Sequence, residues 1–477
     1  MRLKTIYRCQ ECGHSQSKWA GKCPSCGEWN TLVEEAEEVL SAKETAAAER
    51  RTMLTDFSEP PVRLSEAKAI KTDYVPTGIP EFDRVLGGGI VPGQVLLLAG
   101  PPGIGKSTLT METCSALAGN AYKDKTVLYV SGEESAGQVG SRAARLGVNA
   151  ENILLMSETD LTKIIRRFRE LKPAFMVLDS IQTVYHPEFS GGPGSVGQIR
   201  ECASELLKAV KSAGIPMFIL GHVTKDGALA GPKVLEHIVD TVLYFDSEKS
   251  NIYRVLRPNK NRFGPVEETG IFEMTAKGLK SVGDAGRLLG ECDRESSFAG
   301  RAFAMAFEGS RPMLAEIQVL TSRSYLPYPR RTVTGFDLNR AQMLIAALEK
   351  NLGLHFEEKD VFISIQGGFK FKEPALDLAL CAALISSAKE IPLPPDWIFM
   401  GEVGVLAQVS AVPFMDRRLA EAERLEFKYA FTHKPRGKSE NRSKKITVCP
   451  VRDLQGLMQA MLRSQPSKAS HKRQGDS

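Results

Sequence analysis

Short apolar runs recur through the middle of the chain, and longer stretches of mixed character separate them. Runs of four or five apolar residues suit strands buried on both faces, and the stretches between them are long enough for helices. The predicted strands are Val95–Ala99, Val127–Val130, Phe175–Leu178, Met217–Leu220, Val242–Phe245 and Ile252–Leu256. The predicted helices are Ser107–Leu117, Glu134–Leu146, Leu161–Glu170 and Gly197–Ala213. This alternation predicts a parallel α/β sheet.

The pattern divides the 477-residue chain into three folded units and two segments without a regular apolar period. The central α/β unit spans 63–284, and near Gly283-Asp-Ala-Gly286 the pattern changes to a third unit over 285–463. Residues 34–62, rich in Glu and Ala, are predicted to link the central unit to a short unit over 1–33. Residues 464–477 are polar and basic, and they are predicted to be disordered. The third unit's predicted strands are Ala302–Phe307, Ala315–Val319, Val361–Ile365 and Ile398–Glu402, and its predicted helices are Asn339–Lys350, Ala375–Ser387 and Arg417–Leu425.

The first predicted strand of the central unit runs into Gly100-Pro-Pro-Gly-Ile-Gly-Lys-Ser107, a complete G-x-x-x-x-G-K-S loop. Backbone N–H groups in such a loop point at phosphate oxygens, and the following helix N-terminus adds partial positive charge. We expect Lys106 to reach the β- and γ-phosphates and the Ser107 hydroxyl to bind Mg²⁺. The sequence therefore predicts a nucleoside triphosphate site. Its residues are Gly100, Pro101, Pro102, Gly103, Ile104, Gly105, Lys106, Ser107 and Thr108.

Polar side chains follow three more predicted strands. Asp179 ends one strand, where a carboxylate can hold the magnesium ion through water. Glu133 follows another strand and is placed to polarise the attacking water, with its neighbour Glu134 as the less favoured alternative. His222 ends a third strand, where it can sense the γ-phosphate or serve as a structural histidine.

Composition and charge restrict the class of protein only loosely. Hydrophobic residues at 42% and charged residues at 25% are normal for a soluble globular protein. A net charge of +5 permits nucleic-acid binding without requiring it. The N-terminus lacks an apolar signal core, and no apolar run reaches the length of a membrane span. We therefore expect a cytoplasmic protein with reduced thiols and no membrane contact.

Four of the nine cysteines form two C-x-x-C pairs near the N-terminus: Cys9, Cys12, Cys23 and Cys26. Four thiolates on two tight turns fit tetrahedral Zn²⁺, although the spacing also allows an iron centre. A disulfide is disfavoured in a reducing compartment. The unit over 1–33 has little core, so its folding is expected to depend on the metal. The remaining cysteines are interpreted as buried small hydrophobic residues: Cys114, Cys202, Cys292, Cys381 and Cys449.

The sequence around the phosphate loop resembles that of RecA-fold ATPases. Their lead-in is similar to Thr77-Gly-Ile-Pro-Glu-Phe-Asp83, Leu86-Gly-Gly-Gly89 and Pro92-Gly93. Lys260-Asn-Arg-Phe-Gly264 looks like the signature of one family, the bacterial RadA (Sms) DNA repair proteins. Together with the cysteine knuckle and the C-terminal unit, the resemblance covers nearly the whole chain, which is identified as a member of that family.

The resemblance implies a DNA-dependent ATPase of homologous recombination that forms homo-hexameric rings, loads on single-stranded DNA and promotes branch migration. It implies ATP, Mg²⁺ and Zn²⁺ as cofactors, and single-stranded or branched DNA and a RecA-type recombinase as partners. By position, Lys260 and Arg262 match a K-x-R element that reaches a neighbour's ATP in hexameric helicases. Two cations there would stabilise the transferring charge, whereas the alternative is an exposed basic turn.

Two glycine-rich loops are expected to face the ring channel. The first spans 185–198 and the second 223–236, and in the second Lys225 and Lys233 are predicted to contact DNA phosphates. Both loops can also be ordinary surface loops. A further basic and aromatic cluster, which fits either a DNA contact or a contact between protomers, consists of Arg323, Tyr325, Tyr328, Arg330 and Arg331.

The C-terminal unit resembles the α+β Lon protease fold over 367–377 and 401–413. Ala375 stands where Lon has its serine nucleophile, and Asp416 stands where Lon has its lysine base. A Ser–Lys mechanism needs both groups, so the domain is predicted to be proteolytically inactive and to stabilise the ring.

Two other function classes compete with the DNA-translocating ATPase. An ATP-dependent protease of the Lon type is opposed by Ala375 and Asp416. A regulatory ATPase ring of the circadian-clock type shares the core but lacks the cysteine knuckle and the protease-like unit. Stimulation of hydrolysis by single-stranded DNA would distinguish the first class from both.

Overall fold

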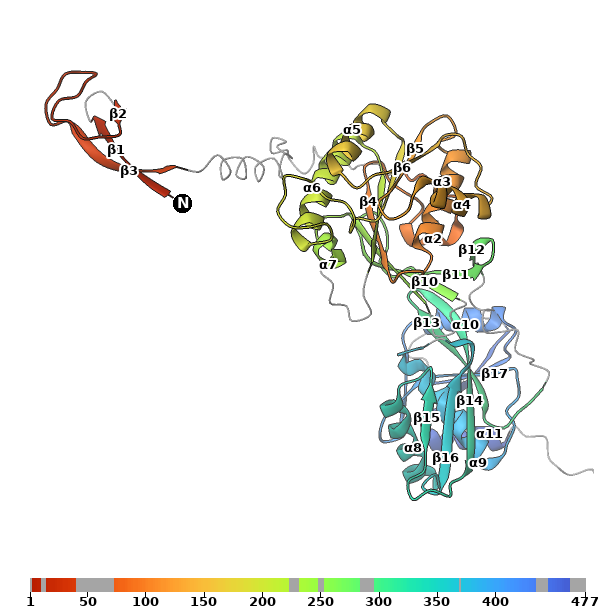
Figure 1. The fold of residues 1–477 in the computed structure, drawn as a ribbon. Helices are drawn as coiled ribbons and strands as arrows, with labels where there is room; N and C mark the ends of the chain where they lie inside the picture. Colours follow the sequence, from red (N-terminus) through yellow and green to blue (C-terminus); the bar gives the residue numbers. More distant parts are fainter. Residues whose placement is uncertain are drawn as a thin grey trace, which may run out of the picture. The chain divides into compact units, whose positions relative to one another are not determined.

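The structure is a computed structural model, and it describes residues 2–9, 14–39, 73–222, 231–247, 253–283, 296–368, 370–434 and 445–463. Two compact units are present, Met1–Lys71 and Thr72–Ser477, and each is described by itself (Figure 1). No helix in the described ranges has the length and apolar character needed to cross a membrane.

The N-terminal unit is a three-stranded antiparallel sheet in the order β2-β1-β3. β1 (Arg2–Cys9) pairs along its whole length with β3 (Leu32–Val39), and β2 (Ser15–Gln16) pairs with the end of β1. The predicted linker therefore starts too early, because residues 34–39 belong to β3. The acidic composition of these residues does not predict a strand. The strand forms because its backbone pairs with β1, which is distant in the sequence.

The second unit is built around a nine-stranded sheet in the order β12-β11-β10-β9-β4-β8-β7-β5-β6. The strands β9, β4, β8, β7, β5 and β6 pair in parallel. The strands β10, β11 and β12 extend the sheet by antiparallel pairing at one edge. The parallel strands are β4 (Val95–Gly100), β5 (Val127–Ser131), β6 (Ile153–Ser157), β7 (Phe175–Asp179), β8 (Met217–His222) and β9 (Thr241–Ser247). The antiparallel strands are β10 (Tyr253–Asn261), β11 (Gly270–Thr275) and β12 (Gly278–Ser281). The predicted parallel α/β sheet is confirmed, with β6, β11 and β12 as additions.

Helices cover both faces of this sheet, and alternate residues of β4 enter two separate apolar cores. Leu96 and Leu98 pack in the core on the side of α2 (Pro80–Leu86), α3 (Lys106–Gly119) and α4 (Ala136–Arg145). Val95 and Leu97 pack in the core on the side of α5 (Leu161–Leu171), α6 (Val196–Ala213) and α7 (Gly231–Glu236). Both cores hold β4 rigidly, and so they fix the strand that leads into the phosphate loop.

Helix α4 begins two residues later than predicted. Ser135 caps it, and its hydroxyl accepts from the backbone N–H of Gln138 in a capping box. Glu134 therefore lies before the helix and is available for other contacts.

The C-terminal part of this unit carries a four-stranded sheet in the order β13-β14-β16-β15 and a parallel three-stranded sheet in the order β17-β20-β21. The first consists of β13 (Arg301–Glu308), β14 (Arg311–Arg323), β15 (Arg331–Thr334) and β16 (Lys359–Ile365). The second consists of β17 (Trp397–Met400), β20 (Tyr429–Thr432) and β21 (Thr447–Pro450). A short pair joins β18 (Glu402–Val403) to β19 (Val409–Ser410). The helices are α8 (Leu338–Leu352), α9 (Asp377–Lys389), α10 (Met415–Arg424) and α11 (Leu454–Arg463).

Two predictions for this part differ from the structure. The predicted strand Ile398–Glu402 is two strands, because the chain leaves the sheet at Gly401, whose N–H donates to the Ala375 carbonyl. The predicted helix Ala375–Ser387 starts with a 3₁₀ turn, Pro374–Leu376, before α9 begins at Asp377. The mixture of helices with separate sheets agrees with the predicted α+β class.

The turn between β13 and β14 packs against the nine-stranded sheet. Arg311, at the start of β14, forms an ion pair with Glu81 of α2, and both side chains are more than nine-tenths buried. Glu81 also accepts from the Ile271 backbone N–H at 3.0 Å, and Ser310 N–H donates to the Glu267 carbonyl at 2.8 Å. We call this group of contacts the junction.

Candidate functional site

The phosphate loop lies at the carboxyl end of β4, where the strand ends at Gly100 and α3 begins at Lys106. Gly105 has φ of 114°, a left-handed conformation that glycine adopts without the steric cost of a Cβ. Helix α3 therefore begins directly at the loop, and the first backbone N–H groups of the helix are directed into the loop. This is the geometry that the sequence predicts for a triphosphate site.

Lys106 is 4% exposed and lies folded back on the loop. Its ammonium donates to the carbonyls of Gly100 at 2.8 Å and Pro101 at 3.0 Å, and lies 3.2 Å from Nδ1 of His222. Burial lowers the pKa of Lys106 to about 8, against the opposing effects of Asp179 and Glu133. The side chain therefore holds its charge less firmly than an exposed lysine would.

His222 joins Lys106 to Glu133. An ammonium group only donates, so Nδ1 of His222 accepts from Lys106 and the proton of a neutral ring lies on Nε2. That proton points at Oε1 of Glu133, 3.0 Å from Nε2. The same carboxylate oxygen accepts from the hydroxyl of Ser180, which follows β7. The predicted sensor and the predicted base are thus in direct contact.

Glu134 is directed elsewhere. Its carboxylate pairs with Arg142 of α4, and its backbone carbonyl accepts from Ser157 at 3.3 Å. Of the two adjacent glutamates, Glu133 is the one that shares contacts with the phosphate-loop lysine through His222, and this favours it over Glu134.

Asp179 ends β7 and is 7% exposed. Its Oδ2 accepts from the Tyr129 hydroxyl at 2.6 Å, and its Oδ1 has no hydrogen-bond partner among the described residues. Mg²⁺ prefers oxygen ligands, and a serine hydroxyl with a carboxylate is a donor set that suits it. Ser107 and Asp179 therefore fit the predicted magnesium site chemically.

Sequence reasoning missed two residues of this site, Tyr129 and Ser180. Both are completely buried, and both bind a predicted catalytic carboxylate. The available signal was a single polar group inside the apolar run Val127–Val130 and a hydroxyl directly after Asp179.

Lys260 and Arg262 lie toward the amino ends of the parallel strands, whereas the phosphate loop of the same chain lies at the carboxyl ends. Lys260 pairs with Val242 and Val242 with Leu97, whereas the loop begins beyond Gly100. The Lys260 ammonium donates to the carbonyls of Glu236 and Val239 at 2.8 and 2.7 Å. The structure thus does not bring this predicted pair to the chain's own triphosphate site.

Arg262 is the more accessible of the two. Its guanidinium donates to Asp240 at 3.2 Å, and its side chain is 55% exposed. Asp240 also accepts from Lys211 at 2.9 Å, so it is shared between two cations.

The first predicted channel loop is organised by Gln198. This side chain is 2% exposed and donates to the carbonyls of His186, Phe189 and Gly191. In the second loop, Lys225 lies outside the described residues, and Lys233 is on α7 with its side chain outside them.

The cluster over Arg323–Arg331 is a protruding loop between β14 and β15. Tyr325 and Tyr328 are 90% and 87% exposed. Arg331 donates to the backbone carbonyl of Phe356 at 2.8 Å, so it holds the loop in place. The two tyrosines have no ring contact or hydrogen bond within the described parts of the chain.

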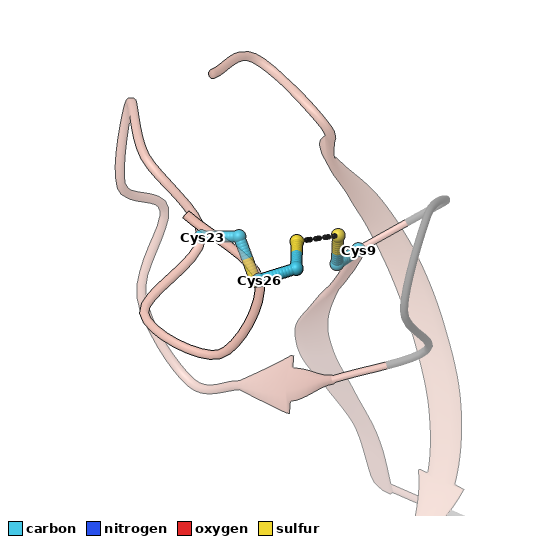
Figure 2. A group of neighbouring side chains, drawn as sticks. All are labelled: Cys9, Cys23 and Cys26. Atoms are coloured by element: carbon cyan, nitrogen blue, oxygen red, sulfur yellow. Dashed lines mark hydrogen bonds between the residues drawn. The ribbon is translucent and has the colours of Figure 1, made fainter. Parts of the chain in front are cut away.

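In the N-terminal unit, the sulfur atoms of Cys9, Cys23 and Cys26 lie within 4.8 Å of one another (Figure 2). The Cys9 and Cys26 sulfurs are 3.6 Å apart. Sulfurs that share one tetrahedral zinc through bonds of ~2.3 Å would lie about 3.8 Å apart. Cys12, the fourth predicted ligand, is outside the described residues. The three thiols that are described fit a zinc ion.

Of the other cysteines, Cys114, Cys202 and Cys381 are buried, as predicted, and Cys449 is half-buried. Cys292 lies outside the described ranges.

The C-terminal domain contains ion pairs around Ala375 and Asp416, the positions predicted to lack the Lon nucleophile and base. Ala375 is buried, and Asp416 lies in the first turn of α10. Beside Ala375, Glu373 pairs with Arg418, whose guanidinium is 0% exposed. On the other side, Asp377 accepts from Arg340 and from the Val403 backbone N–H at 3.1 Å. None of these groups is a serine–lysine pair.

Comparison with known proteins adds sequence relationships to this geometry. Residues 7–34 match the rubredoxin metal binding domain family, and residues 60–228 match the AAA domain family. The chain is 44% identical over 429 residues to the DNA repair protein RadA of Bacillus subtilis (strain 168), covering 90% of this chain and 92% of that one. It is 43% identical over 431 residues to the DNA repair protein RadA of Aquifex aeolicus (strain VF5), covering 90% and 94%.

Among solved structures, the KaiC-like protein PH0186 from Pyrococcus horikoshii OT3 matches with 22% identity and a TM-score of 0.37, covering 44% of this chain and 99% of that one. The family matches and the cysteine cluster confirm the predicted RecA-like P-loop ATPase core and N-terminal zinc ribbon.

Proposed function

The chain belongs to the RadA family of DNA repair proteins, and from this membership we propose that it is a DNA-dependent ATPase of homologous recombination and recombinational repair. In this proposal, the protein forms a homo-hexameric ring, binds single-stranded DNA and uses ATP hydrolysis to promote branch migration. Branched DNA and a RecA-type recombinase are its proposed partners.

One observation supports the ATPase assignment most strongly. Glu133, Asp179 and His222 lie at or just after the ends of three strands, and they converge on Lys106 at the start of α3. Parallel strands place their carboxyl ends at one edge of a sheet, which is where open α/β sheets bind ligands.

The chemistry follows from these positions. Lys106 would leave the loop carbonyls for the β- and γ-phosphates, and Ser107 with Asp179 would hold Mg²⁺, which when bound neutralises phosphate charge. Glu133 would orient and polarise the attacking water. His222 contacts both Lys106 and Glu133, so a γ-phosphate that draws Lys106 away would also release one contact of Glu133.

Lys260 and Arg262 are proposed to act on the triphosphate of the adjacent protomer. Their position toward the amino ends of the strands, away from the phosphate loop, supports this. In a ring with head-to-tail contacts, two different surfaces of neighbouring protomers meet. The exposure of Arg262 leaves its guanidinium accessible to a neighbour.

DNA would pass the two channel loops, with Lys225 and Lys233 on its phosphates. The zinc knuckle, held by Cys9, Cys12, Cys23 and Cys26, would provide a separate contact surface. The C-terminal domain would stabilise the ring and enlarge its basic surface without peptidase activity, because Ala375 and Asp416 supply neither nucleophile nor base.

The test is the rate of ATP hydrolysis with and without single-stranded DNA, together with negative-stain imaging of the particles. Stimulation by DNA and ring-shaped particles are expected. A rate that does not respond to any DNA, single-stranded or branched, would contradict the proposal. Casein degradation in the presence of ATP would instead favour a protease.

A further inference from the structure

Tyr129 places a hydroxyl group inside an apolar core. It lies in the middle of β5, is 0% exposed, and its ring packs in the same core as Leu98, Leu109 and Val177. A phenylalanine would fill the same space without the cost of burying a polar group. The hydroxyl therefore needs a partner that offsets its desolvation.

That partner is Asp179. The Tyr129 hydroxyl donates to Oδ2 at 2.6 Å, across two paired strands in which Tyr129 is opposite Val177 and Ser131 opposite Asp179. Burial, together with the Asp179 charge, raises the pKa of Tyr129 well above its usual value, so the hydroxyl remains a donor. The bond occupies one carboxylate oxygen and leaves Oδ1 open.

Tyr129 also packs in the same core as Leu109 of α3, the phosphate-loop helix. Thr110 is completely buried in α3, one turn after Ser107, and its hydroxyl lies 3.1 Å from the Lys106 carbonyl and 3.3 Å from the Ser107 carbonyl. The core that holds Tyr129 therefore also holds the helix that carries Ser107, the other residue that fits Mg²⁺.

We propose that Tyr129 is a positioning residue for magnesium: its hydroxyl fixes Asp179 Oδ2 and leaves Oδ1 available to the metal. This inference rests on the proposed MgATP site. Groups that orient metal-binding carboxylates typically change metal affinity or activity 10–100-fold when they are removed.

The experiment compares Tyr129→Phe with Tyr122→Phe in the full-length chain. Tyr122 lies at the border of the same core and is 9% exposed, and its hydroxyl has no hydrogen-bond partner in the described part of the chain. Binding of a fluorescent ATP analogue is titrated with Mg²⁺, and again in EDTA. Tyr129→Phe should raise the Mg²⁺ concentration for half-maximal effect by about 10-fold or more. Affinity in EDTA and the Tm should stay close to those of Tyr122→Phe.

A double-mutant cycle separates positioning from packing. Asp179→Asn should raise the Mg²⁺ requirement, and Tyr129→Phe should add little to it, because the hydroxyl acts through that carboxylate. An unchanged Mg²⁺ requirement in Tyr129→Phe, equal loss of affinity in EDTA, or additive effects would each overturn the inference.

The failure of the proposed function would look different. If the wild-type chain shows no response to DNA but Tyr129→Phe shifts its Mg²⁺ requirement, the function fails and the positioning role stands. If the wild-type chain binds the analogue without any dependence on Mg²⁺, the positioning role is overturned with the metal site.

Discussion

The central sheet and the C-terminal domain both contain carboxylates at the ends of strands or helices, but they use them differently. In the central sheet, Asp179 and Glu133 each have one oxygen in hydrogen bonds, and the other has no partner among the described residues. In the C-terminal domain, both oxygens of Asp377 accept from Arg340, and Glu373 accepts from Arg418 on one oxygen and from the Phe307 N–H on the other.

The difference indicates which region does chemistry. A carboxylate with a free oxygen can bind a metal, a water or a proton, and its fixed half keeps it oriented. A carboxylate whose two oxygens are both paired with buried donors contributes to the fold, and breaking such a pair leaves an uncompensated charge. Both regions contain ordered carboxylates, so the number of carboxylate oxygens without a hydrogen-bond partner among the described residues is what distinguishes them.

Replacement of a glutamate by glutamine, once in the central sheet and once in the C-terminal domain, gives the largest expected effects. Glu133→Gln should reduce ATP turnover by on the order of 10²–10⁴-fold with little change in stability, because the proposed general base is lost. Glu373→Gln should lower the free energy of unfolding by about 3 kcal/mol, because Arg418 is left buried without its charge partner. Turnover and urea unfolding are measured for both variants. A loss of stability in Glu133→Gln without loss of turnover would reverse the comparison.

Removal of the phosphate-loop cation comes next. Lys106→Ala should lower kcat by on the order of 10²–10³-fold, the usual cost of losing one preorganised charge stabiliser. Lys277→Ala, an exposed lysine near the same helix, is the matched control and should turn over ATP normally. Near-normal hydrolysis by Lys106→Ala would mean that another site does the work.

A smaller effect is expected from a change at Arg262. It tests whether an adjacent protomer completes the triphosphate site. Arg262→Ala should bind ATP but lose DNA-stimulated hydrolysis. Mixing it in equal amounts with Lys106→Ala should restore activity at about a quarter of the interfaces, those that combine an intact loop with an intact arginine. The measurement is DNA-stimulated turnover against mixing ratio. Mixed rings without any recovery would place Arg262 outside the site.

The smallest expected effect is the uptake of a proton by Lys106 when nucleotide binds. Burial lowers the pKa of Lys106 to about 8 from 10.5. Between these values, the unfolded chain binds more protons than the folded one, so this group makes the folded state more stable as pH rises from about 8 to about 10.5. A triphosphate should raise the pKa again, so nucleotide binding at pH near 8.5 should take up less than one proton.

Calorimetry in buffers of different ionisation enthalpy measures that proton. Lys106→Arg should show no uptake, because guanidinium stays protonated. Equal uptake in Lys106→Arg and in the wild-type chain would assign the proton to another group.

The sequence predicted the phosphate loop and the polar strand ends because both are local. Lys106 and Ser107 belong to one continuous motif, and Asp179 follows a run of apolar residues. The contacts that orient these groups are not local. Tyr129 reaches Asp179 across 50 residues of chain, and Ser180 reaches Glu133 across 47. No periodicity signals such pairs, because the strand order of the sheet creates them.

The errors of prediction have the same origin. β3 continues into acidic residues because β1 pairs with it. β6 was missed although Ile153–Met156 is an apolar run like those of the predicted strands, and it lies at the edge of the sheet with Leu154 and Leu155 more than one-third exposed. Arg418 is completely buried in a helix whose sequence is strongly polar. Its partners, Glu373 and the Met305 carbonyl, lie 45 and 113 residues away. The burial of this arginine follows from long-range contacts and not from the composition of its helix.

The junction also determines where this chain can be divided. Glu81 belongs to α2, near the beginning of the ATPase core, and its charge is neutralised by Arg311 from the domain that follows. A fragment that ends before β13 would retain the buried Glu81 without Arg311, with the Ile271 N–H and the more exposed Arg84, 3.7 Å away, as its remaining partners. We therefore expect the ATPase core to be less stable on its own, although its motifs are complete. The C-terminal domain supplies the core with a buried cation, Arg311, whatever other role that domain has.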